Sequence, residues 1–172
     1  PELPLPRIRH GSRIVRVEGL GEVVVLGWVA GDGFVVTKLP GTVRLPEGTR
    51  LEDVLTVEGQ RVVEAIQPHD LDVVVLRVPE FGNVPWMPVV SGLKRGTRVW
   101  ITVMKDGSAV EIPGVVEVRI QRDPQSVSAT RDEGIFTPWS IPSQGSRNAI
   151  LLDDMDRLLG VVGVDAGVIE MG

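Results

Sequence analysis

A glycine-rich turn between two apolar runs is the strongest constraint on the fold of this chain. Gly31-Asp32-Gly33 follows Trp28-Val29 and precedes Phe34-Val35-Val36. Glycine adopts the positive φ of a tight turn at low steric cost, and β-branched and aromatic residues fit pleated strands. The stretch therefore predicts a β-hairpin whose second strand runs into Thr37-Lys38-Leu39-Pro40.

Short apolar runs separated by turn residues continue along the whole chain. We expect strands over 14–18, 22–26, 54–57, 62–66, 71–78, 96–104, 108–112, 114–121, 135–137, 149–152, 157–164 and 168–169. We expect 54–57 to pair with 62–66, and the aliphatic run 71–78 to be covered on both faces. No stretch of ten residues has the apolar periodicity of a helix. Turn signals roughly every 8–12 residues are typical of an all-β sandwich or barrel.

The composition argues against several kinds of site. The 172 residues include no cysteine and only two histidines, His10 and His69, so disulfides, thiolate sites and multi-histidine zinc centres are excluded. Asp153, Asp154 and Asp156 have too few ligands and too short a spacing for a calcium loop, which favours a solvated hairpin tip. We therefore expect no metal and no cofactor.

Charge and hydropathy exclude two classes of partner. The net charge is −5 with both signs interspersed, whereas nucleic-acid binding needs a basic face. No run of about eighteen apolar residues predicts a membrane span. Residues 1–10 lack the basic and apolar segments of a signal peptide. We expect no nucleic acid, no membrane insertion and, by default, a cytoplasmic location.

Six segments in order resemble the trypsin-like serine peptidases, in particular the bacterial and archaeal HtrA/Deg branch. They are the opening hairpin and residues 54–60, 65–76, 84–99, 114–120 and 151–162. The resemblance implies an all-β, two-barrel trypsin-like serine peptidase fold that forms a single unit over 1–172. The N-terminal barrel would span about 11–80 and the C-terminal barrel about 95–170.

The resemblance also assigns the three catalytic positions of the family. In the family, the strand after the Asp-Gly turn ends in Thr-Asn-Ala-His, and that histidine is the general base. Here Pro40 stands at the histidine position, Asp72 at the aspartate and Ser146 at the serine. Proline cannot accept a proton, so the general base is missing from its family position. Counting back from Gly160 puts Arg147 at the nucleophile instead, and both registers stay open.

The glycines around the family's nucleophile are also replaced. The motif Gly-x-Ser-Gly-Gly-Pro is lost in either register, with Gln144 in place of the first glycine and Arg-Asn-Ala over 147–149. The oxyanion pocket depends on backbone conformations that glycine permits. In the family, the loop at Trp139 lines the substrate cleft. The resemblance therefore implies a binding set of Trp139, Gln144, Gly145 and Arg147.

Two functional hypotheses follow from these replacements. The first is a catalytically inactive peptidase homologue that binds an extended peptide or protein, or serves as a scaffold in a homo-oligomer or larger assembly. The alternative is an active serine endopeptidase that uses Ser146 with a displaced base, His10 or His69. The sequence favours the inactive homologue.

Overall fold

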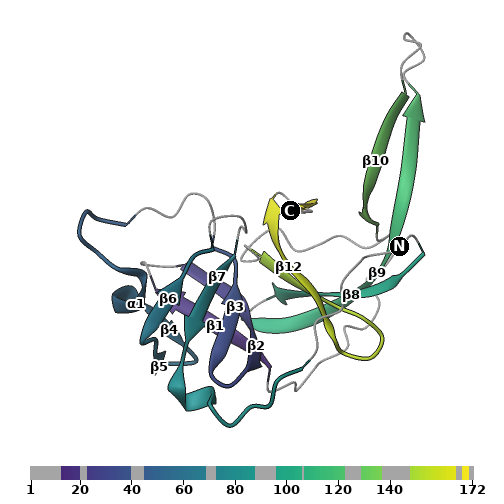
Figure 1. The fold of residues 1–172 in the computed structure, drawn as a ribbon. Helices are drawn as coiled ribbons and strands as arrows, with labels where there is room; N and C mark the ends of the chain where they lie inside the picture. Colours follow the sequence, from purple (N-terminus) through teal and green to yellow (C-terminus); the bar gives the residue numbers. More distant parts are fainter. Residues whose placement is uncertain are drawn as a thin grey trace.

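A computed structural model describes residues 13–19, 23–39, 45–68, 73–87, 96–105, 107–122, 129–136, 148–165 and 168–170. Within these ranges the helices are one turn of α-helix, α1 (Leu51–Val54), and one turn of 3-10 helix, η1 (Pro79–Phe81). All other regular structure is β and forms two sheets (Figure 1). The all-β prediction is confirmed.

The first sheet has seven strands in the order β5-β4-β1-β2-β3-β7-β6. They are β1 (Ile14–Gly19), β2 (Val23–Gly31), β3 (Phe34–Thr37), β4 (Leu55–Val57), β5 (Gln60–Arg61), β6 (Glu64–Ile66) and β7 (Val74–Arg77). The predicted hairpin joins β2 to β3, and both Asp32 (φ 50°) and Gly33 (φ 82°) have the positive φ of a type I′ turn.

The second sheet has six strands in the order β10-β9-β8-β11-β12-β13. They are β8 (Arg98–Lys105), β9 (Ser108–Arg122), β10 (Ala129–Phe136), β11 (Asn148–Leu152), β12 (Leu158–Asp165) and β13 (Val168–Glu170). The predicted hairpin over 149–152 and 157–164 is confirmed as β11–β12.

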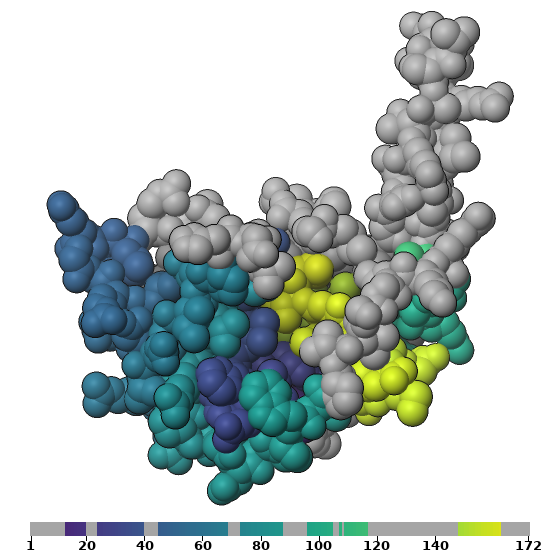
Figure 2. Space-filling model, in the orientation of Figure 1, coloured from purple at the N-terminus to yellow at the C-terminus, as the bar shows by residue number. Residues whose placement is uncertain are grey.

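Three strands carry apolar side chains on both faces, and this alternation builds the junction between the sheets. In β8, Val99, Ile101 and Val103 belong to the core of the second sheet, whereas Met104 faces the other way. A strand sends successive side chains to opposite faces, so β2 and β11 divide in the same manner. The cluster between the sheets consists of Leu26, Trp28, Met104, Ile150, Leu152 and Leu158. Figure 2 shows the purple N-terminal strands in direct contact with the yellow C-terminal strands.

The expected pairing of 54–57 with 62–66 is wrong. Strand β4 pairs with β5 over residues 60–61, and β6 pairs with β7 at the other edge of the sheet. Only Val62 and Val63 separate β5 from β6, and Val62 is buried in the core of the first sheet. The two edges of the sheet therefore approach each other, and the chain crosses between them.

The aliphatic run at 71–78 is shorter and less covered than expected. Its strand is β7, in which Val74 and Leu76 are buried but Val75 is half-buried and Arg77 is exposed. One face lies on the core, and the other is partly open to solvent. A continuous aliphatic run does not distinguish these two situations.

Strand β9 runs unbroken through Pro113, where the sequence suggested two strands. Pro113 pairs with Trp100 of β8, and the pairing of β9 with β10 begins only at Val115. At position 113 the strand thus has a partner on one side, which is where a sheet tolerates proline. Strand β10 begins at Ala129, six residues before the expected strand over 135–137.

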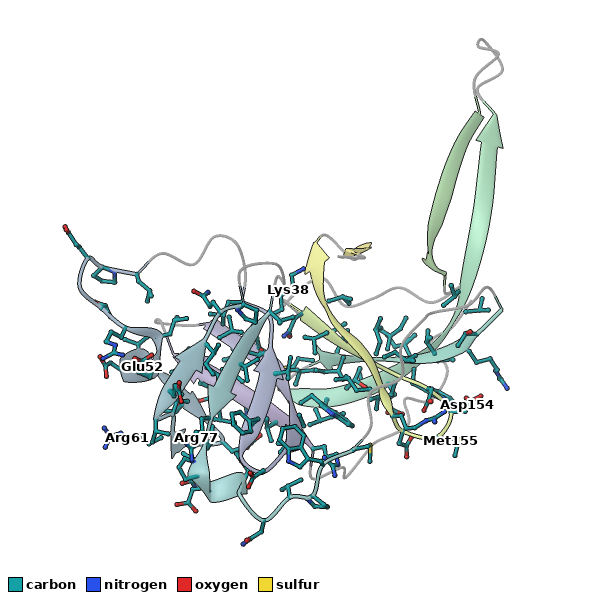
Figure 3. All side chains as sticks on the ribbon, in the orientation of Figure 1. Lys38, Glu52, Arg61, Arg77, Asp154 and Met155 are labelled. Carbon is teal, nitrogen blue, oxygen red and sulfur yellow. The ribbon has the colours of Figure 1, made fainter. Side chains whose placement is uncertain are left out.

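The β11–β12 turn is organised by the buried carboxylate of Asp153. Its Oδ1 accepts the backbone N–H groups of Met155 (2.9 Å) and Arg157 (2.8 Å), and its Oδ2 accepts Nε–H of Arg157 (2.8 Å). Burial by itself raises the pKa of the Asp153 carboxyl, but these hydrogen bonds and the nearby guanidinium hold the pKa below its ordinary value. Asp154 and Met155 lie at the tip of this hairpin (Figure 3).

We predict that Asp153→Asn lowers the free energy of unfolding by about 1 kcal/mol at neutral pH, because an amide N–H then faces Nε–H of Arg157. A lowered folded-state pKa contributes stability above the unfolded pKa, and this contribution is lost as pH falls through the folded pKa. The difference from the wild type should therefore narrow in acid, as measured by urea unfolding at several pH values. Asp154→Asn is the control, since Asp154 is exposed in the same turn. A difference that is constant with pH would contradict the assignment.

Candidate functional site

All residues that the sequence proposed for catalysis or binding lie outside the described ranges. They are His10, Pro40, His69, Asp72, Trp139, Gln144, Gly145, Ser146 and Arg147. The candidate site is therefore described through the residues that neighbour these positions in the sequence and that the structure does describe.

Three described residues flank the family's catalytic positions at a distance of two residues. Lys38 lies two residues before Pro40, Val74 two residues after Asp72, and Asn148 two residues after Ser146. Strands β3 and β7 pair with Thr37 opposite Val74, so the first two flanks lie at the same end of the first sheet. Asn148 begins β11 in the second sheet. The Asn148 side chain bonds to the Lys38 carbonyl, so the start of β11 lies at this same end of the first sheet.

The Asn148 side chain is inserted into the first sheet. Its Oδ1 accepts the backbone N–H of Leu26 (2.9 Å), and its Nδ2 donates to the Leu26 carbonyl (2.7 Å) and to the Lys38 carbonyl (3.3 Å). The regular β2–β3 pairing ends at Gly27 opposite Thr37, and the next pair would join Leu26 to Lys38. The amide takes the place of that pair. Figure 3 shows Lys38 at the end of β3 that faces the second sheet.

Burial makes these hydrogen bonds costly to lose. Asn148 is 1% exposed and Thr37 is fully buried, and the Thr37 hydroxyl donates to the Leu26 carbonyl at 2.8 Å. Asn148 Nδ2 also approaches Thr37 Oγ1 at 3.4 Å. A buried polar group left without a partner costs about 1–3 kcal/mol. The network therefore fixes the end of β3 against the start of β11.

The described part of this site contains no imidazole, because neither histidine lies in the described ranges. Its polar side chains are the Asn148 amide and the Thr37 hydroxyl, which already bond to backbone groups, and the Lys38 amine. The same ranges contain no group of three or more acidic or histidine side chains arranged for a metal ion. None of the described helices has the length and apolarity that a membrane span requires.

An exposed aromatic residue lies at the other end of the first sheet. Trp86 is 61% exposed and stacks on Phe34 with ring centroids 5.7 Å apart. A Cβ added at Gly31 would lie 2.6 Å from the Trp86 Cα, so glycine is required there. Gly31 is five residues along β2 from Leu26, or about 16 Å at the rise of a strand. Trp86 thus lies away from the Asn148 network.

The sequence analysis did not identify the role of Asn148. In the sequence it stood out only as a replacement of a family glycine, and its partners Leu26 and Thr37 are 122 and 111 residues away. No local pattern signals a contact over that separation. A polar residue at the start of the uniformly apolar run Ala149 to Leu152 is the one available sign.

We predict that Asn148→Leu lowers the free energy of unfolding by about 2 kcal/mol or more, because the buried Leu26 N–H loses its acceptor. Asn148→Asp should also destabilise at neutral pH, since an oxygen then faces the carbonyls of Leu26 and Lys38. The measurement is urea unfolding followed by tryptophan fluorescence. The same two exchanges at Asn83, an exposed residue, are controls with little expected effect. Equal effects at both positions would refute the role of Asn148.

No protein-family model and no curated protein matches the sequence. Solved structures match the fold. The Rv3671c protease from M. tuberculosis, in its inactive form, is 18% identical with a TM-score of 0.59, covering 91% of this chain and 81% of that one. The MamO protease domain from Magnetospirillum magneticum is 17% identical with a TM-score of 0.54, covering 92% and 88%.

A further solved structure that matches is Deg5, which is 18% identical with a TM-score of 0.51 and coverages of 90% and 80%. At such identities a structural likeness establishes the fold and leaves the chemistry open. The all-β, two-barrel fold predicted from the sequence is confirmed. This chain has the fold of the trypsin-like serine proteases.

Proposed function

We propose that this chain is a catalytically inactive homologue of the trypsin-like serine proteases that binds an extended segment of another protein. The observation that carries the proposal is Pro40 at the position of the family's histidine. The Ser-His-Asp mechanism requires an imidazole that takes the serine proton and later gives it to the leaving group. A pyrrolidine ring does neither.

The described flanks support the register on which this assignment depends. Lys38, Val74 and Asn148 meet at one end of the first sheet, and each is two residues from a family position. Two residues span at most about 7 Å of chain. This arrangement of the flanks supports a register in which Pro40, Asp72 and Ser146 take the family's three catalytic positions.

The combined losses are large on the scale of enzyme catalysis. Removing the base of a serine-protease triad costs about 10⁶-fold in kcat, and each oxyanion donor accounts for about 10²–10³-fold. Here the base and the glycines that shape the oxyanion loop are replaced together. Residual hydrolysis would be too slow to serve as a function.

Binding of an extended protein segment requires a strand end and contact side chains, and it does not require the catalytic residues. Among the described residues, β12 continues to Asp165, two residues beyond its last pair with β11 at Asn148–Gly163, while its other side pairs with β13. A strand that runs past its neighbour offers backbone groups to an added peptide. Trp139 and Arg147, which precede β11 in the chain, supply the aromatic and cationic side chains that dominate many interfaces.

The absence of a reactive serine is tested with a fluorophosphonate probe. We predict no labelling of the folded full chain, measured by intact mass, and no hydrolysis of casein. Trypsin treated in parallel is the positive control. Stoichiometric labelling that disappears in Ser146→Ala would overturn the proposal in favour of an active peptidase. His10→Ala and His69→Ala would then identify the displaced base.

Binding is tested separately with fluorescein-labelled casein as an unfolded polypeptide, followed by fluorescence anisotropy. We predict binding without cleavage, weakened about tenfold or more by Trp139→Ala and by Arg147→Glu. Trp86→Ala is the matched control, because Trp86 is exposed but lies at the other end of the first sheet. Lack of binding, or equal losses in all three variants, would contradict the proposed cleft.

A further inference from the structure

The end of β9 and the whole of β10 leave the second sheet as a two-stranded ribbon. Strand β8 pairs with β9 from Lys105–Ser108 as far as Arg98–Val115, and the chain before β8 bonds to Val116. From there to Arg122, β10 is the only neighbour of β9 within the described chain. Figure 1 shows this ribbon projecting away from both sheets.

An isolated ribbon of this kind is not expected to be stable alone. Two strands without a further strand or a covering layer are marginal in water, and a free edge presents unpaired backbone N–H and C=O groups. Strand β10 forms one edge of the six-stranded sheet. Alternation along β9 puts Val118 and Ile120 on the same face of the ribbon as Val116. Among the described residues, the ribbon therefore combines an apolar row with an edge that no strand pairs.

We propose that β10 pairs with β10 of a second copy of this chain, around a two-fold axis perpendicular to the ribbon. The result is a four-stranded sheet in the order β9-β10-β10-β9. Such an axis makes the pairing antiparallel and keeps each face of the ribbon on the same side. Two residues that lie opposite each other across the axis must then have side chains on the same face of the sheet. The residue opposite a given position can therefore change only in steps of two along the partner strand.

One register within these limits makes the charges of β10 complementary. With Asp132 on the axis, Arg131 lies opposite the partner's Glu133, and Glu133 lies opposite the partner's Arg131. Opposite charges at directly paired positions stabilise a sheet, and like charges destabilise it. An axis at Arg131 or at Glu133 would instead place that residue opposite its own copy.

An axis at Asp132 places two aspartates of the same charge opposite each other, and a cation at the neighbouring position of β9 offsets their repulsion. In β9, Arg119 lies opposite Asp132, so each aspartate at the axis is next to a cation of its own chain. In the register of β10 with β9, Arg131 lies opposite Ile120 and Glu133 lies opposite Val118, so the directly paired positions of β9 are apolar. Charges on an edge strand often serve to keep sheets apart. Here Arg131 and Glu133 carry opposite charges on either side of Asp132, so a two-fold axis at Asp132 brings each of them opposite its counter-charge in the second copy.

The test is the oligomeric state of the full chain, measured by sedimentation equilibrium over a range of concentrations. We expect the wild type to form dimers. Arg131→Glu and Glu133→Arg should each weaken dimerisation by about tenfold or more, because two attractive pairs become repulsive. Glu117→Arg is the control, since it makes the same charge change on β9, away from the new contact.

The decisive arm mixes the two single variants in equal amounts. In a mixed pair every glutamate faces an arginine of the other variant, so association should return, and the double variant that carries both exchanges should dimerise like the wild type. A wild type that stays monomeric at every concentration would overturn the proposal. So would single variants that dimerise as well as the wild type, or a mixture that does not associate. Binding of casein is measured separately, so failure here does not bear on the proposed function.

Discussion

The hydrogen bonds between the Asn148 amide and the backbone of Leu26 are the interaction on which the rest of this structure depends. The two sheets also share an apolar cluster, but apolar contacts are not directional and tolerate sliding. An amide that occupies one position of the β2–β3 ladder fixes the register of one sheet against the other. It does so at the place where the ends of β3, β7 and β11 converge.

This position gives the proposed loss of the catalytic residues a structural meaning. In a working triad, the histidine, aspartate and serine themselves bond to one another and contribute to joining the two halves of the molecule. Here the proposed replacement of the histidine removes that link, and Asn148 supplies another through hydrogen bonds to backbone groups. We infer that the fold serves binding at its surface and that the buried Asn148 amide maintains the junction between the two sheets.

The sequence predicted best where local chemistry decides the structure. The type I′ turn at Asp32-Gly33 and the hairpin around Asp153 follow from residues a few positions apart. Strand pairing at the edges was missed because β5 consists of only two exposed polar residues, Gln60 and Arg61. The passage of β9 through Pro113 was missed for a similar reason, since the sequence does not reveal which side of a strand lacks a neighbour. For the site, the resemblance supplied Pro40, Asp72 and Ser146, whereas Asn148 became visible only in three dimensions. The expected barrel boundaries stay predictions.

A double-mutant cycle between Thr37 and Asn148 tests the central claim most directly, because the two residues belong to different sheets and share the Leu26 carbonyl as acceptor. The free energy of unfolding would be measured for the wild type, Thr37→Val, Asn148→Leu and the double variant. If the amide joins the sheets as described, the two effects will be non-additive, with a coupling of about 1 kcal/mol. Effects that add to within about 0.3 kcal/mol would show that Asn148 and Thr37 act independently, which would contradict a shared hydrogen-bond network across the junction.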